Sequence, residues 1–166
     1  MAKQGKRTTF QDAVKNTPSV SEKYHRGLQA LNNTDQARIK CENPQSLAGS
    51  INLDEAIRQL SEPNSPVWDY GIGYRPGAQS NDDDEVYWVE VHSANSKHVT
   101  EVITKLRWLQ DWLQTKAIPL SRLKRRFVWI ASGAVALPAN SPQRKLIARH
   151  GIHFAGSRLA IPLKTE

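Results

Sequence analysis

The chain has 166 residues, a net charge of +7 and 39% hydrophobic residues, which suits one globular domain with a core of its own. Its single cysteine, Cys41, excludes an internal disulfide, and no apolar run reaches the roughly 18 residues that a membrane span requires. The N-terminus is basic but no apolar segment follows it, so we expect a cytoplasmic protein without a secretory signal or a membrane partner.

The first 45 residues are polar and rich in turn-forming residues. We expect short helices at Thr9–Lys15 and Ser21–Leu31, the second with a serine at its N-cap. Because no sustained hydrophobic periodicity connects them, we interpret residues 1–45 as an N-terminal arm that is partly helical or mobile. Residues 46–166 would then form the folded α/β domain.

A helix followed by two strands is predicted at the start of this domain. Apolar residues recur at helical spacing from Leu53 to Leu60, and Asn52 is suited to cap that helix. Val67–Tyr74 and Val86–His92 are rich in β-branched and aromatic residues, which predicts the two strands of a hairpin with a long polar loop.

The second half of the chain alternates helices and strands. Ser96–Gln114 is the strongest predicted helix, because its apolar residues share one face. Phe127–Ser132 is a near-continuous apolar run, which is typical of a buried parallel strand. A helix at Pro142–His150 and a strand at Arg158–Leu163 complete the pattern. The order predicts an α/β fold with a mixed central sheet flanked by helices.

Alternation along the second strand places two polar side chains on an apolar face. Val86, Trp88, Glu90 and His92 share that face, and Asp69 lies among aromatic and aliphatic residues on the preceding strand. An acid within a hydrophobic strand is costly unless a cation compensates its charge. Two such carboxylates beside a base are the minimum set for a divalent ion that polarises a phosphodiester and activates water.

A known nuclease family has this arrangement. Asp69, 20 intervening residues and then Glu90-Val91-His92, followed by an amphipathic helix and a buried strand, resemble the core of the PD-(D/E)xK nuclease superfamily between Leu53 and Leu163. The resemblance implies the restriction-endonuclease-like fold, with elements in the order α-β-β-β-α-β. It also implies that Asp69 and Glu90 bind Mg²⁺ or Mn²⁺.

The sequence departs from this family at one catalytic position. His92 stands where the family has a lysine, so the resemblance assigns His92 as general base or extra ligand and Lys105, on the next helix, as the replacement cation. Lys97 is a weaker candidate for that cation. Glu55, on the first helix, is a candidate third metal ligand.

Structural roles are the alternatives for the same side chains. Asp69 could accept hydrogen bonds at a strand end, and His92 could be a core histidine bonded to Glu90. Lys105 could be a solvated helix lysine and Glu55 an acid that interacts with the helix dipole. The other histidines, among them His98, show no metal-ligand spacing. Four tryptophans are best interpreted as residues of the core or its edge, with stacking on nucleobases as the alternative: Trp88, Trp108, Trp112 and Trp129.

Charge is unevenly distributed along the chain. The net charge is +4 over residues 1–50, −6 over 51–100 and +9 over 101–166. An acidic centre within a basic chain favours a protein that holds a metal among carboxylates and binds nucleic acid, although a patchy solvated surface gives the same totals. The residues expected to contact a phosphate backbone are Arg122, Lys124, Arg125, Arg126, Arg144 and Lys145.

The sequence therefore leads to one principal hypothesis and two alternatives. The principal one is a divalent-metal-dependent nuclease that hydrolyses DNA or RNA. The first alternative is a catalytically inactive nuclease-like domain that binds nucleic acid or protein. The second is a partner-binding subunit in which the buried Asp, Glu and His side chains form only a structural hydrogen-bond network.

Overall fold

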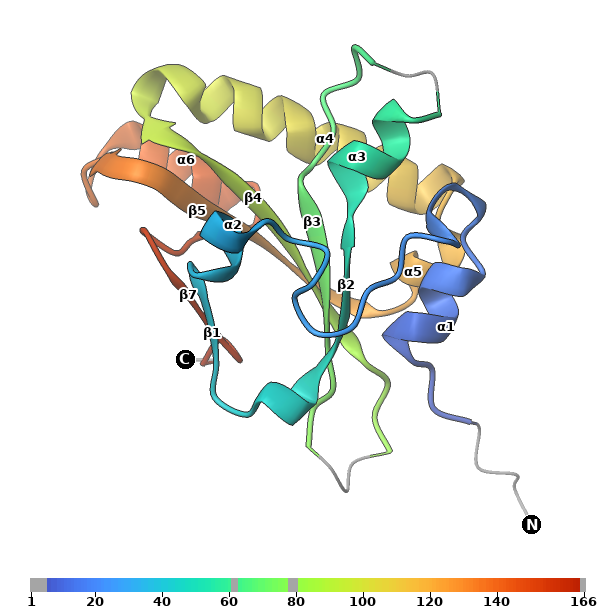
Figure 1. The fold of residues 1–166 in the computed structure, drawn as a ribbon. Helices are drawn as coiled ribbons and strands as arrows, with labels where there is room; N and C mark the ends of the chain where they lie inside the picture. The colour runs from blue at the N-terminus through green and yellow to red at the C-terminus, as the bar shows by residue number, and fades with distance from the viewer. Residues whose placement is uncertain (1–5, 61–62, 78–80, 165–166) are drawn as a thin grey trace.

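The protein has a mixed α/β fold in which a five-stranded sheet is flanked by helices (Figure 1). The computed structural model describes residues 6–60, 63–77 and 81–164. No helix in these ranges is long and apolar enough to cross a membrane. The strands are β1 (Ile39–Cys41), β2 (Leu47–Asn52), β3 (Tyr70–Tyr74), β4 (Glu85–Asn95), β5 (Lys124–Ala136), β6 (Ile152–Phe154) and β7 (Leu159–Ile161). The helices are α1 (Phe10–Lys15), α2 (Asn33–Gln36), α3 (Leu53–Arg58), α4 (Val99–Thr115), α5 (Ile118–Ser121) and α6 (Pro142–Arg149).

The strand order of the main sheet is β2-β3-β4-β5-β6, so β4 is its central strand. The β2–β3 and β3–β4 pairs are antiparallel, and β4–β5 and β5–β6 are parallel. Glu90 of β4 lies opposite Trp129 of β5, and the register shifts just after His92. Such irregularities often re-aim side chains next to functional sites.

Each face of the sheet has its own hydrophobic cluster. One contains Trp88 and Trp129 from the sheet together with buried residues of α1, α3 and α4, and α4 crosses this face (Figure 1). The other contains Tyr87, Val89 and Ile130 and is covered by residues around Leu31 and by the parallel β1–β7 ribbon. The alternation predicted for β4 is confirmed, because Trp88 and Val89 belong to opposite clusters. Trp88, Trp112 and Trp129 are buried and Trp108 is partly buried against the first cluster, as expected of residues of the core or its edge. Trp68 is buried as well.

The described part of the N-terminal segment packs into the domain. Phe10, Val14 and Val20 are fully buried. Asp84, in the loop before β4, accepts a hydrogen bond from the Phe10 backbone N–H at 2.8 Å and pairs with Arg7 at 3.1 Å. Residues 6–45 therefore contribute buried side chains to both hydrophobic clusters, and they form α1, α2 and β1.

Several predicted elements are confirmed and others are not. Helices α1, α3, α4 and α6 and strands β3, β4, β5 and β7 lie where the sequence places them. The helix expected at Ser21–Leu31 is wrong: this segment consists of turns, and His25 forms a backbone bridge to Ser50. Strands β1, β2 and β6 were not predicted. Strands β1 and β6 have three residues each, and β2 contains a glycine and a serine that weaken its β signal.

Candidate functional site

A buried acid occupies the middle of the central strand. Glu90 is 0% exposed and lies on the same face of the sheet as Trp88, beneath α4. Its Oε2 atom accepts a hydrogen bond from the Nζ of Lys105 at 2.6 Å. Lys105 lies on α4 and has an exposed side-chain fraction of 16%. The ammonium and the carboxylate thus compensate each other inside the fold.

Asp69 and Glu90 are held together through each other's backbone. Tyr70 pairs with Val89 in the β3–β4 register, so Asp69, which directly precedes β3, lies level with Glu90. The Asp69 N–H donates to Glu90 Oε1 at 3.1 Å, and the Val91 N–H donates to Asp69 Oδ2 at 2.9 Å. We call Asp69, Glu90 and Lys105 the carboxylate–lysine cluster.

Burial makes both carboxyl groups of this cluster harder to ionise. Desolvation raises the pKa of Asp69 to about 6, even though Lys105 and the Val91 N–H act to lower it. Desolvation, together with the Asp69 charge, raises the pKa of Glu90 well above its usual range despite the neighbouring Lys105. The pKa of Lys105 is raised because the attraction of Glu90 and Asp69 outweighs the effect of burial, so the lysine stays charged.

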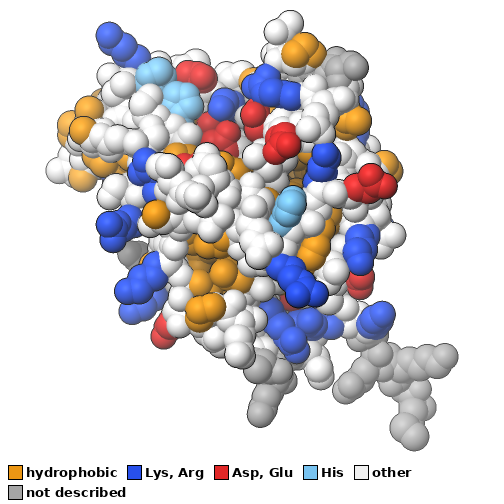
Figure 2. All heavy atoms as spheres, in the orientation of Figure 1, with side chains coloured by type: hydrophobic (Ala, Val, Ile, Leu, Met, Phe, Trp, Pro, Cys, Tyr) orange, Lys and Arg blue, Asp and Glu red, His pale blue; other side chains and the backbone are white. Residues whose placement is uncertain are grey.

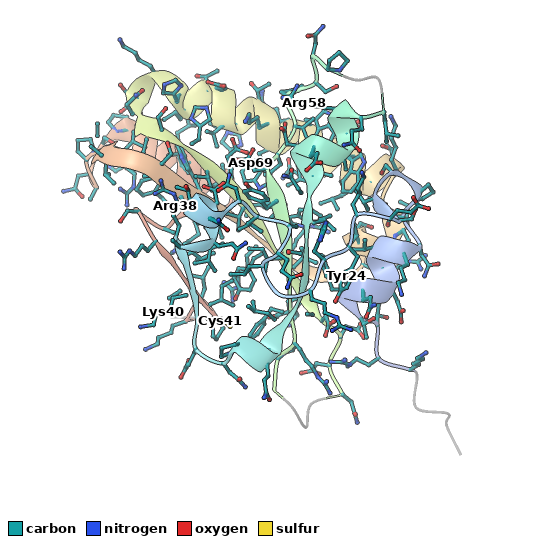
Figure 3. The ribbon with its side chains drawn as sticks, viewed as in Figure 1. Tyr24, Arg38, Lys40, Cys41, Arg58 and Asp69 are labelled. Carbon is teal, nitrogen blue, oxygen red and sulfur yellow. The ribbon has the colours of Figure 1, made fainter. Side chains whose placement is uncertain are left out.

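Two further acids flank Asp69, and each is paired with an arginine. Asp35 and Asp54 both raise the pKa of Asp69, although burial dominates that shift. Asp54 pairs with Arg58 at 2.9 Å and Asp35 with Arg38 at 3.6 Å. In the view of Figure 3, Asp69 lies between the labelled Arg38 and Arg58. Figure 2 shows acidic side chains gathered with histidine and basic side chains in the upper part of this face.

Helix α3 places Asp54 beside Asp69. It does not bring Glu55, the predicted third metal ligand, to the carboxylate–lysine cluster. Glu55 is exposed, and its carboxylate accepts a hydrogen bond from Gln59 at 3.3 Å. The Asp54 N–H, by contrast, donates to the Asp69 carbonyl at 3.3 Å. The two acids are consecutive, and the sequence alone did not indicate which of them lies on the side of α3 that faces the cluster.

His92 contacts a glutamate other than Glu90. Its Nε2 atom lies 3.3 Å from Oε1 of Glu101, whose Oε2 atom lies 3.1 Å from Nδ1 of His98. His98 was not expected here. Its position depends on the sharp connection between β4 and α4, a three-residue 3₁₀ turn at Ser96–His98. This turn lies within the helix predicted at Ser96–Gln114. The spacing His-x5-His-x2-Glu is the signal that could have revealed this group.

The predicted phosphate-binding residues lie mainly at the other end of the strands. Lys124 is paired with Glu85 at the start of β4, whereas Glu90 lies five residues further along that strand. Arg122, Lys124, Arg125 and Lys145 are exposed, and Arg126 is partly buried. Arg144 lies 4.4 Å from the centre of the Phe154 ring and donates to the Leu137 carbonyl, so it has a packing role.

The donor set of the carboxylate–lysine cluster fits a hard divalent cation. Mg²⁺ and Mn²⁺ prefer carboxylate oxygens, and Asp69 and Glu90 supply them. No described residue donates a hydrogen bond to Oδ1 of Asp69, so this half-buried oxygen is available to a ligand. Burial raises the pKa of both carboxyl groups, and a cation bound between them would favour their ionised forms.

Comparisons with known proteins add no assignment. No family model, no curated protein sequence and no solved structure matches the chain. Any functional conclusion therefore rests on the residues of the site and on their geometry.

Proposed function

We propose that the protein is a divalent-metal-dependent nuclease of the PD-(D/E)xK type, which hydrolyses phosphodiester bonds in DNA or RNA. The observation that carries this proposal is the carboxylate–lysine cluster. Two acids from adjacent strands are tied to each other's backbone, and a lysine lies 2.6 Å from one of them.

The order of elements supports the same proposal. Strands β2, β3 and β4, then α4 and then β5 resemble the β-β-β-α-β part of the restriction-endonuclease-like order, with α3 inserted between β2 and β3 and α5 between α4 and β5. Helix α1 would be the first helix of that order, although α2 and β1 lie between it and β2. Asp69 directly precedes the second strand of that series and Glu90 lies on the third, as the resemblance expects of the metal ligands. Helix α4 packs across the sheet, and β5 is buried in its middle, as in that fold.

Each residue of the cluster has a distinct role in this proposal. Asp69 and Glu90 would hold Mg²⁺ or Mn²⁺, which supplies Lewis-acid polarisation and a more acidic bound water. Lys105 replaces the missing strand lysine: its ammonium holds Glu90 in place and stabilises negative charge that develops on a phosphate oxygen. His92 lies two residues beyond Glu90 on the same face of β4. In this proposal it borders the metal site on that side.

Cleavage assays with a matched pair of variants test the proposal. Circular and linear DNA and single-stranded RNA are incubated with the protein in Mg²⁺ or Mn²⁺, beside Glu90→Gln and the exposed control Glu42→Gln. We expect metal-dependent cleavage that Glu90→Gln lowers by at least about 100-fold and Glu42→Gln leaves unchanged. Cleavage that persists in Glu90→Gln would remove the cluster from the mechanism.

The binding-only alternative gives a different result in the same assays. Salt-sensitive binding of nucleic acid without cleavage in either metal would identify a nuclease-like domain that has no turnover. The contact of His92 with Glu101, away from the two acids, is the observation that favours this alternative.

A further inference from the structure

A second group of metal-ligating side chains lies where β4 meets α4. His92 comes from β4 just before its register shift, His98 from the 3₁₀ turn, and Glu101 from the first turn of α4. The two imidazole rings are 4.7 Å apart between centroids. One ligand atom from each of the three residues lies within 4.8 Å of the others. We call these residues the histidine–glutamate cluster.

Both ring nitrogens of His92 face hydrogen-bond acceptors. Nδ1 lies 3.1 Å from the Ser93 carbonyl oxygen, and Nε2 lies 3.3 Å from a carboxylate oxygen of Glu101. The Ser93 carbonyl and an ionised Glu101 can both only accept, whereas a neutral imidazole has a single N–H to donate, so it can satisfy only one of these two contacts. A metal ion bound to Nε2 would join that nitrogen to Glu101, while Nδ1–H donates to the Ser93 carbonyl.

We propose that the histidine–glutamate cluster binds a transition-metal ion of the zinc class through His92 Nε2, His98 Nδ1 and Glu101. Tetrahedral zinc with bonds of about 2.0–2.1 Å places its ligand atoms roughly 3.3 Å apart. The His92 Nε2 atom lies 3.3 Å from Glu101 Oε1, and the His98 Nδ1 atom lies 3.1 Å from the other oxygen, Oε2. One ligand atom from each residue lies within 4.8 Å of the others, so small side-chain adjustments would bring the three onto one ion. The Ser93 carbonyl, which orients the His92 ring, has the role that a second hydrogen-bonded layer plays around metal-binding histidines.

The exposure of the three side chains suits an accessible ion. Their exposed fractions are 15% for His92, 34% for His98 and 52% for Glu101, so a hydrated ion can reach the ligands. Three protein ligands leave one position open to water, as in zinc sites that bind or activate a ligand. Imidazole nitrogens select zinc, cobalt or nickel over magnesium. This site therefore differs in chemistry from the oxygen-only carboxylate–lysine cluster.

Zinc titration of the full chain tests the inference without any cleavage assay. Zn²⁺ is added in the presence of excess Mg²⁺, which competes for carboxylate-only sites. Binding is followed by calorimetry and by the ¹⁵N NMR signals of the imidazole rings. The compared variants are His98→Ala, whose side chain is partly exposed, and His150→Ala, a histidine at the end of α6.

The expected result is one bound Zn²⁺ per chain, with shifts of the His92 and His98 ring nitrogens. His98→Ala should weaken binding by more than about 100-fold, because losing even an outer hydrogen bond of a metal site costs 10–100-fold. His150→Ala should bind like the wild type. Absence of zinc binding, unshifted imidazole signals or unchanged affinity in His98→Ala would each overturn the proposal. None of these outcomes depends on whether the protein is a nuclease.

Discussion

Lys105 is the residue on which the ionisation of the site depends. Its ammonium lies 2.6 Å from a carboxylate that is 0% exposed, and it also attracts Asp69. Without this cation the cluster would contain two buried acids and no compensating charge. Breaking a buried pair from one side is more costly than removing both partners, because an unpaired charge stays behind.

The destabilisation caused by Lys105→Met and that caused by Glu90→Gln, added together, should therefore exceed the destabilisation of the double variant. We expect the Lys105→Met and Glu90→Gln effects to be non-additive by about 1–3 kcal/mol in favour of the double variant. Urea unfolding of the wild type, both single variants and the double variant at neutral pH measures this coupling. Strictly additive effects would mean that the ion pair makes no net contribution.

Asp69 should lower stability at neutral pH because its folded-state pKa is about 6 and its ordinary value is 3.8. Between these pH values the folded protein binds more protons than the unfolded chain, so stability falls as pH rises. The penalty is complete above about pH 6 and absent below about pH 4. Asp69→Asn lacks the charge and retains an oxygen that can accept from Val91.

Asp69→Asn should thus be more stable than the wild type at pH 8, by about 1–3 kcal/mol, and no more stable at pH 4. Free energies of unfolding measured for both proteins across this range check the prediction. An advantage that is constant with pH would place its cause outside the ionisation of Asp69. Side chains that serve function often reduce the stability of the fold, and a charged Asp69 would be one of them.

Sequence patterns predicted some of these residues and missed others for physical reasons. Strand alternation was enough to place Glu90 and His92 on one face, because a strand fixes which residues are neighbours. His98 and Asp54 depend instead on the path of the chain between elements. A turn of three residues brings His98 back to His92, and the orientation of α3 selects Asp54 over Glu55. No local periodicity encodes either.

At the scale of elements, the N-terminal segment and β3 depend on each other. The Cβ of an alanine at position 73 would lie 2.4 Å from the ring of Phe10. Phe10 is 0% exposed, and its backbone is tied to Asp84. The polar composition of residues 1–45 concealed this contact, because a few buried side chains suffice to dock a segment whose other residues face water.

Gly73→Ala should therefore displace Phe10 and destabilise the fold by about 1–3 kcal/mol, the usual cost of overpacking a well-filled core. Gly133→Ala is the control, because that glycine lies in β5 with no atom near its added Cβ, and it should be neutral or slightly stabilising. Thermal unfolding followed by circular dichroism compares them. Equal melting temperatures for the two variants would show that α1 is not firmly docked on β3.

At the scale of the whole molecule, charge is separated along the sheet. Lys124 and its basic neighbours lie at the start of β5, level with Glu85, and Glu90 is five residues further along β4. At about 3.3 Å per residue, the two regions are roughly 17 Å apart. The acidic residues Asp82–Glu85 line a cavity together with Arg122 and Lys124, so they partly neutralise this end.

Under the proposed nuclease function, a nucleic acid that reaches both regions must extend over roughly five base pairs. Lys124→Ala should then reduce the salt dependence of duplex binding, because each lost phosphate contact lowers the slope of log K against log salt by about 0.9. Lys15→Ala, an exposed lysine at the end of α1, is the matched control and should keep the wild-type slope. Fluorescence anisotropy at several salt concentrations gives both slopes.

Identical slopes for the two variants would exclude the basic end of β5 from the nucleic-acid interface. The substrate would then have to approach the carboxylate–lysine cluster over the Arg38 and Arg58 side of the molecule.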